Sequence, residues 1–123
     1  MGLDMYLTGE TYFCNREDRR GTKKGELFHL GYWRKHPNLH GYIVQEFADG
    51  EDNCQPIELS PEQISQIIKA IESGQLPITT GFFFGESDGS EQPLDLVFFR
   101  EALAWLNEAP AEEWRSVYYQ ASW

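Results

Sequence analysis

The sequence YWRKHPNLH, residues 32–40, marks the point where a strand pattern changes to a helix pattern. Residues 27–33 are predicted to form a strand. Pro37 suits the first position of a helix, because its missing N–H breaks no hydrogen bond there. The apolar residues that follow have the spacing of one helical face and are Leu39, Ile43 and Phe47. We therefore expect a strand-to-helix junction, with the helix ending at 49–50.

Alternating apolar residues predict strands at both ends of the chain. Every second side chain is apolar in residues 3–8, and the same alternation recurs in residues 117–123. Residues 15–25 contain no apolar side chain, so we expect a mobile loop that joins the first strand to the strand at 27–33 in a long hairpin. A shorter alternation predicts a short strand at 57–59.

Two further helices are predicted from their start signals. Ser60 and Gln63 have the spacing of a capping box, with Pro61 at the first helical position and Gly74 as the stop. A third helix is expected from Pro93 to about Ala109. Its apolar stripe is predicted to consist of Leu94, Val97, Phe98, Ala102, Trp105 and Leu106.

Strands at both ends with helices between them predict an α+β fold, in which an antiparallel or mixed sheet of about four or five strands carries three helices. The 123 residues suffice for one domain with a buried core, and 41% of them are hydrophobic. We find no repeat or linker and expect one α+β domain over residues 1–123.

The charge is unevenly distributed along the chain. The net charge is −10, and residues 51–123 hold three Lys or Arg against thirteen Asp or Glu. Direct nucleic-acid binding is disfavoured, because it depends on cations that neutralise phosphates. We expect a protein partner, either basic or nucleic-acid-handling. The predicted acidic interaction surface consists of Glu86, Asp88, Glu91, Glu112 and Glu113.

No signal peptide or membrane span is recognisable in the sequence, so a cytoplasmic location without membrane contact is expected. The two cysteines, Cys14 and Cys54, match neither a disulfide framework nor a zinc pattern, and we expect buried thiols. No cofactor is predicted.

Four separated motifs carry a resemblance to a known family. They are MGLDMYL at 1–7, GYWRK at 31–35 followed by His40, GFFFG at 81–85 and YYQASW at 118–123. Together they resemble a family of small proteins encoded by phages, prophages and bacterial genomes. That family has no assigned activity, so the resemblance implies origin more than chemistry. It also implies a histidine at His40 and an Asp-x-Cys step at residues 52–54.

The cations before Pro37 suggest an anion site. Arg34, Lys35 and His36 stand at an expected helix start, where the helix dipole also favours negative charge. An anion or nucleotide sensing domain is therefore one alternative function. The competing interpretation is structural, with Arg34 in an internal salt bridge to Asp4, Asp52 or the terminal carboxylate of Trp123.

A catalytic alternative uses the same region. Cys54 and His40 are candidates for nucleophile and base, with Asp52 or Asn53 as the orienting group. A small hydrolase or phosphate-ester-handling enzyme would gather Arg34, Lys35, His40 and Cys54 around one pocket. His36 and His40 are four residues apart and are candidate metal ligands, but no metal site is predicted.

The aromatic residues are expected to serve the core first. This applies to the GFFFG segment and to Tyr6, Tyr32, Trp33, Tyr119 and Trp123, whose second interpretation is a surface for stacking or for a partner. The uneven charge favours a small, acidic, non-catalytic protein-interaction module, and the resemblance implies that it is of phage or prophage type.

Overall fold

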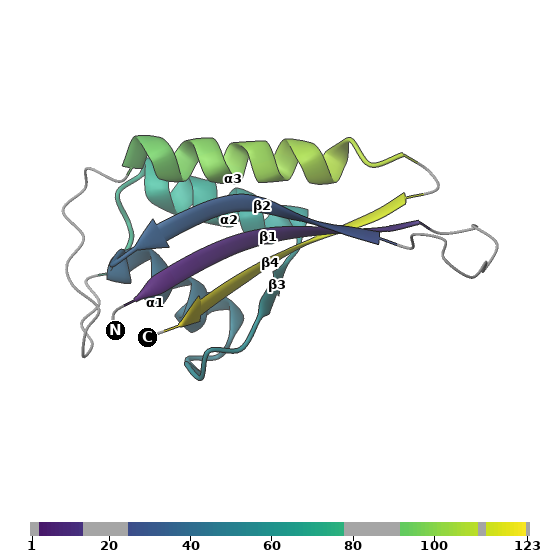
Figure 1. Ribbon diagram of the computed structural model, residues 1–123. Helices are drawn as coiled ribbons and strands as arrows, with labels where there is room; N and C mark the ends of the chain where they lie inside the picture. The colour runs from purple at the N-terminus through teal and green to yellow at the C-terminus, as the bar shows by residue number, and fades with distance from the viewer. Residues whose placement is uncertain (1–2, 14–24, 78–91, 111–112, 123) are drawn as a thin grey trace.

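The computed structural model describes residues 3–13, 25–77, 92–110 and 113–122. Within them, one antiparallel four-stranded sheet with the order β2-β1-β4-β3 is combined with three helices (Figure 1). The elements are β1 (Asp4–Phe13), β2 (Gly25–Arg34), α1 (Pro37–Phe47), β3 (Ile57–Leu59), α2 (Pro61–Glu72), α3 (Gln92–Asn107) and β4 (Glu113–Ser122). The predicted α+β class is confirmed, and the sheet is antiparallel rather than mixed.

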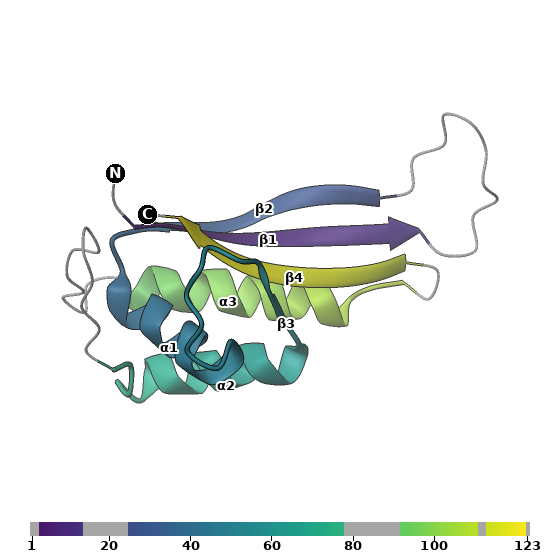
Figure 2. The same cartoon turned by 90° about the horizontal axis from the view of Figure 1, so that it is seen from below.

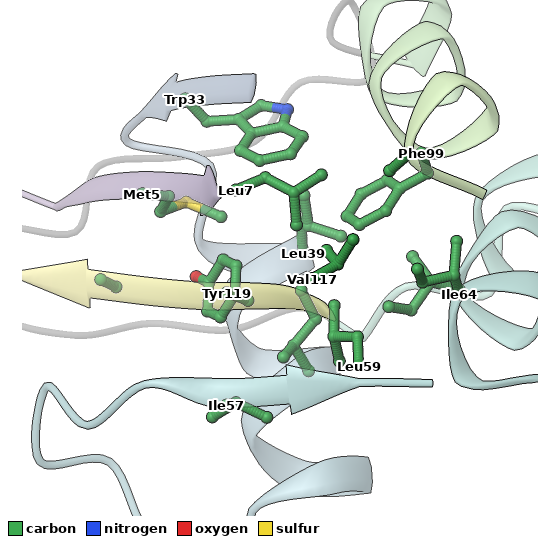
Figure 3. Close-up of a cluster of buried hydrophobic side chains, with 14 of the residues drawn as sticks. Met5, Leu7, Trp33, Leu39, Ile57, Leu59, Ile64, Phe99, Val117 and Tyr119 are labelled. Carbon is green, nitrogen blue, oxygen red and sulfur yellow. The ribbon is translucent and has the colours of Figure 1, made fainter. Parts of the chain in front are cut away.

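The three helices lie on one side of the sheet and leave its other face open (Figure 2). On β1 the alternation predicted from sequence directs Leu3, Met5 and Leu7 toward the helices, and each of these side chains is fully buried. They meet Leu39 of α1 and Phe99 of α3 in a single hydrophobic core (Figure 3). The fold therefore has two layers, with the core between sheet and helices.

The helix starts follow the sequence signals. Ser60 Oγ accepts a hydrogen bond from the Gln63 backbone N–H at 3.2 Å, and Gln63 Oε1 accepts one from the Ser60 N–H at 2.9 Å. The capping box is thus complete, and Pro61 occupies the first turn of α2. Pro37 likewise occupies the first turn of α1, as predicted.

Close packing of α3 against the sheet depends on two glycines. A Cβ on Gly31 would lie 2.9 Å from the Phe98 ring, and one on Gly9 would lie 2.9 Å from the Trp105 ring. Neither distance is compatible with an ordinary side chain, so these positions let aromatic rings of α3 contact the backbone of β1 and β2.

The predicted apolar stripe of α3 is wrong in part. The buried positions of this helix are Asp95, Phe99 and Ala102, whereas Leu94 and Val97 are about half exposed. The helix is rotated relative to the prediction because Asp95 has buried polar partners, which hydrophobic periodicity alone does not reveal.

Other expectations differ at the strands. Tyr6 and Tyr32 are not core residues, since each is 39% exposed on the open side of the sheet. The last strand begins at Glu113, four residues earlier than predicted, because it pairs with β1 along its whole length. The predicted loop at 15–25, except Gly25, and the GFFFG segment at 81–85 lie outside the described residues.

Candidate functional site

Asp95 forms the centre of a buried polar junction between α3, the end of β2 and the start of α1. The residue is 1% exposed, and its Oδ1 accepts a hydrogen bond from Trp33 Nε1 at 2.5 Å. Its Oδ2 lies 2.7 Å from Nε2 of His36, which is 3% exposed. Asp95 also stands in the first turn of α3, where the helix dipole favours a negative charge. These partners compensate the burial of the carboxylate and tie three elements together.

The three residues of the predicted anion site, Arg34, Lys35 and His36, do not lie together in the structure. Arg34 and Lys35 are exposed, whereas the imidazole of His36 is buried beside Asp95. The Asp95 carboxylate thus already provides an anion at His36. Arg34 lies opposite Asp4 in the register of β1 and β2, and Lys35 donates its backbone N–H to Leu3 O at 2.7 Å. The structure therefore brings Arg34 and Lys35 to one exposed corner and separates His36 from them.

His40 belongs to a second chain of polar groups, which runs from the buried Tyr119 to the exposed Asp52. Its Nδ1 lies 2.6 Å from the hydroxyl of Tyr119, and its Nε2 lies 2.9 Å from Oδ1 of Asp52. His40 and Tyr119 are 2% and 1% exposed. Burial, with a smaller contribution from the Asp52 carboxylate, raises the pKa of the Tyr119 phenol well above its usual value. The phenol therefore stays neutral, and a Tyr119 O–H donating to Nδ1 with an Nε2–H donating to Asp52 satisfies every group in the chain.

The predicted catalytic set is only partly assembled. His40 and Asp52 are in contact, as a base and its orienting group would be, but both ring nitrogens of His40 are engaged by Asp52 and Tyr119. Activation of the Cys54 thiol by His40 would require one of these hydrogen bonds to break. Cys54 is partly buried, and its carbonyl accepts a hydrogen bond from Gln120 Nε2 at 2.8 Å.

The two candidate metal ligands serve different partners. His36 pairs with Asp95 and His40 with Asp52, although they are separated by only one helical turn. Among the residues that the structure describes, no group of three or more His, Cys, Asp or Glu side chains has an arrangement that could hold a metal ion.

The open face of the sheet presents large side chains that the helices do not cover. We define the open face by the outward residues of β1, β2 and β4. Its most exposed large side chains are Tyr6 at 39%, Tyr32 at 39%, Tyr12 at 49%, Trp114 at 70% and Leu27 at 73%. Sequence alternation placed Tyr6 on this side of β1 but did not show that no helix covers it.

Cross-strand pairing arranges the aromatic residues of the open face in rows. Tyr6 lies opposite Tyr32, with ring centroids 5.3 Å apart, and Tyr12 lies opposite Trp114. A hydrogen bond to Asp4 raises the pKa of the Tyr32 phenol, and one to Glu10 raises the pKa of the Tyr12 phenol. Both hydroxyls therefore remain protonated at neutral pH, so the rows combine apolar rings with polar tips.

Of the predicted acidic interaction surface, only Glu113 lies within the described residues. Its carboxylate accepts a hydrogen bond from Arg115 Nε at 2.5 Å, and its side chain is 16% exposed. The guanidinium of Arg115 also lies over the Trp105 ring and donates to the Trp105 carbonyl at 2.6 Å. Glu113 is therefore a member of an internal ion pair. Glu86, Asp88, Glu91 and Glu112 lie outside the described residues.

Comparisons of the chain with protein-family models, with curated proteins and with solved structures found no significant match. The described residues form a two-layer α+β domain with a buried His36–Asp95 pair, a partly buried His40–Asp52 pair and an aromatic sheet face that the helices do not cover. No helix of the described residues has both the length and the apolar content that a membrane crossing requires.

Proposed function

We propose that this chain is a non-catalytic protein-interaction module of phage or prophage type, which binds a basic protein partner through the open face of its sheet. The observation that carries the proposal is the exposure of Tyr6, Tyr12, Tyr32 and Trp114 on the open face. Tyrosine and tryptophan are enriched in protein interfaces, where their rings supply contact area at low cost in conformational entropy.

The position of these residues strengthens the proposal. Antiparallel sheets with one solvated face usually carry polar residues there, whereas this face has aromatic side chains on all three long strands. Isolated exposed apolar residues are common and need no explanation. Here Tyr12 and Trp114 are direct cross-strand neighbours, and Leu27 lies on the adjoining part of β2.

The charge of the chain supports a basic partner. The net charge of −10 attracts positively charged proteins and speeds their encounter with the surface. The open face itself contributes carboxylates from Asp4 and Glu10 of β1, and Glu58 of β3 lies beside it, opposite Tyr118. A partner rich in arginine or lysine would meet both carboxylates and π-faces there.

The site around His40 favours a structural role over catalysis. A general base must have a ring nitrogen within reach of the proton that it removes. The His40 side chain is instead buried, and its two nitrogens are engaged, one by the buried hydroxyl of Tyr119 and the other by Asp52. For this reason we prefer binding to the hydrolase alternative.

Capture of partners from a bacterial lysate tests the proposal with two matched variants. One carries Tyr12→Ser, Leu27→Ser and Trp114→Ser on the open face. The control carries Leu94→Ser and Val97→Ser on α3, where the native side chains are 50% and 47% exposed. We expect basic proteins to be captured by the native chain and the control and lost from the open-face variant. Identical captured proteins in all three would contradict the proposal.

A further inference from the structure

A pocket of about 300 Å³ opens in the sheet face beside the short strand β3. Its lining residues are Thr8, Glu10, Pro56, Tyr118 and Gln120. The strand β3 pairs with β4 over only three residues, and Pro56 precedes it, so the sheet narrows at this point. Binding pockets for small molecules span roughly 300–1,000 Å³. The volume therefore suits one side chain or a small group rather than a larger ligand.

The charges around this pocket select for a cation. Glu10 contributes a carboxylate to the lining, and Glu58 lies directly opposite Tyr118 in the register of β3 and β4. Glu10 lies diagonally across from Tyr118, because Thr8 and Ser116 are the respective direct neighbours. The Tyr118 ring thus has a carboxylate on each neighbouring strand. An anion would be repelled here, whereas a cation would meet the Glu10 carboxylate and the π-face of Tyr118, with the charge of Glu58 on the neighbouring strand.

The polar groups of the lining are suited to a ligand with many donors. One N–H of the Gln120 amide is engaged with the carbonyl of Cys54 at 2.8 Å, and the oxygen of this side chain can accept hydrogen bonds. Thr8 adds a hydroxyl, which also accepts hydrogen bonds. A guanidinium has five N–H donors and no acceptor, and its flat surface stacks on aromatic rings.

We propose that this pocket receives an arginine side chain of the basic partner, with the guanidinium stacked on Tyr118 and paired with Glu10. The inference rests on the proposed function, because it names the group that the open face recognises. Arginine is favoured over lysine, since a planar guanidinium bonds a carboxylate through two parallel N–H groups while contacting a ring.

Titration of the isotopically labelled protein with the peptide acetyl-Gly-Arg-Gly-amide, followed by ¹H–¹⁵N NMR, tests the inference. We expect saturable shifts in the amides of Thr8, Glu10, Tyr118 and Gln120. The peptide with citrulline in place of arginine keeps the shape without the charge and is expected to cause no such shifts. The lysine peptide should bind more weakly than the arginine peptide.

Three variants locate the binding. Glu10→Gln and Tyr118→Leu should each weaken binding about three-fold or more, as expected for a partly exposed ion pair and cation–π contact. Tyr118→Phe keeps the ring and should bind like the native chain. The matched control is Glu46→Gln, which removes one exposed carboxylate from α1 on the helix side. Unchanged thermal unfolding would show that the variants are folded.

Two outcomes would overturn the inference. One is equal binding of the arginine and citrulline peptides, and the other is equal weakening by Glu10→Gln and Glu46→Gln. If partner capture still depends on the open face but the arginine peptide does not bind in the pocket, only this inference fails. If capture is also independent of the open face, the proposed function fails with it.

Discussion

Trp33 and Tyr32 are neighbours on β2, and each donates a hydrogen bond to an aspartate, but on opposite faces of the sheet. The indole of Trp33 is 4% exposed and donates to Asp95, whereas Tyr32 is 39% exposed and donates to Asp4 at 2.6 Å. On the covered face the hydrogen bond replaces contact with water altogether. On the open face water competes with it.

The same hydrogen-bond chemistry has different consequences on the two faces of the sheet. Trp33 stacks on Phe99 with ring centroids 5.4 Å apart, and its polar nitrogen has to be satisfied inside the core. The Tyr6–Tyr32 pair needs no such compensation, because its hydroxyls are accessible to solvent. The covered face therefore specifies the fold, and the open face is available for recognition.

We expect the largest loss of stability when the hydrogen bond on the covered face, from Trp33 to Asp95, is removed. Asp95→Ala leaves the Trp33 N–H and the His36 ring nitrogen without their carboxylate in the core. We expect a loss of about 3 kcal/mol in the free energy of unfolding, measured by urea denaturation. Asp95→Asn should lose less, since its amide oxygen still accepts from Trp33. A loss below about 1 kcal/mol for Asp95→Ala would show that the junction does not stabilise the fold.

A pH dependence separates the buried phenol from the exposed ones. The folded-state pKa of Tyr119 is raised well above the unfolded value of about 10, so the folded state retains its proton where the unfolded state loses it. The contribution of the Tyr119 phenol to the free energy of unfolding is fully present below about pH 10. It falls as the pH rises further, by at most about 1.4 kcal/mol per pH unit. Urea midpoints measured at increasing alkaline pH should decline less steeply for Tyr119→Phe than for Tyr32→Phe.

Tyr119→Phe also has an effect at neutral pH. It removes the hydroxyl that satisfies His40 Nδ1 in a buried position. We expect a loss of about 1–2 kcal/mol in the free energy of unfolding. His40→Asn, which cannot reach both Tyr119 and Asp52, should lose a similar amount, and the double variant should lose less than the sum. Strict additivity would show that the two residues do not act as one chain.

Local signals in the sequence were sufficient for most of the fold. The alternation of residues 3–8, the capping box at Ser60 and the proline at 37 each depend on nearby residues, and all are present in the structure as predicted. The orientation of α3 was not predicted, because aspartate is a polar residue and a hydrophobic pattern does not assign it to the buried face. The burial of Asp95 depends on Trp33 and His36, which lie 62 and 59 residues away.

The candidate site was less predictable than the fold for the same reason. His40 and Asp52 were singled out by type, and the structure brings them together. Tyr119 was assigned to the core, but its hydroxyl contact with His40 spans 79 residues and has no local signal. The open face was not predicted, because Tyr6 and Tyr32 are aromatic and were expected in the core, whereas the three helices of the described residues lie on the other side of the sheet (Figure 2).

We expect the smallest loss of stability when the hydrogen bond on the open face, from Tyr32 to Asp4, is removed. Asp4→Ala removes the acceptor of the Tyr32 hydroxyl, but water replaces it because the bond lies at the surface. We expect a change in unfolding free energy at least about five-fold smaller than that of Asp95→Ala, with both variants measured by the same urea denaturation. The pKa of Tyr32 should fall toward its ordinary value, which ultraviolet titration of the phenol would detect. Comparable losses of stability for the two aspartates would mean that burial does not distinguish the two faces, and the open face would then belong to the structural part of the molecule.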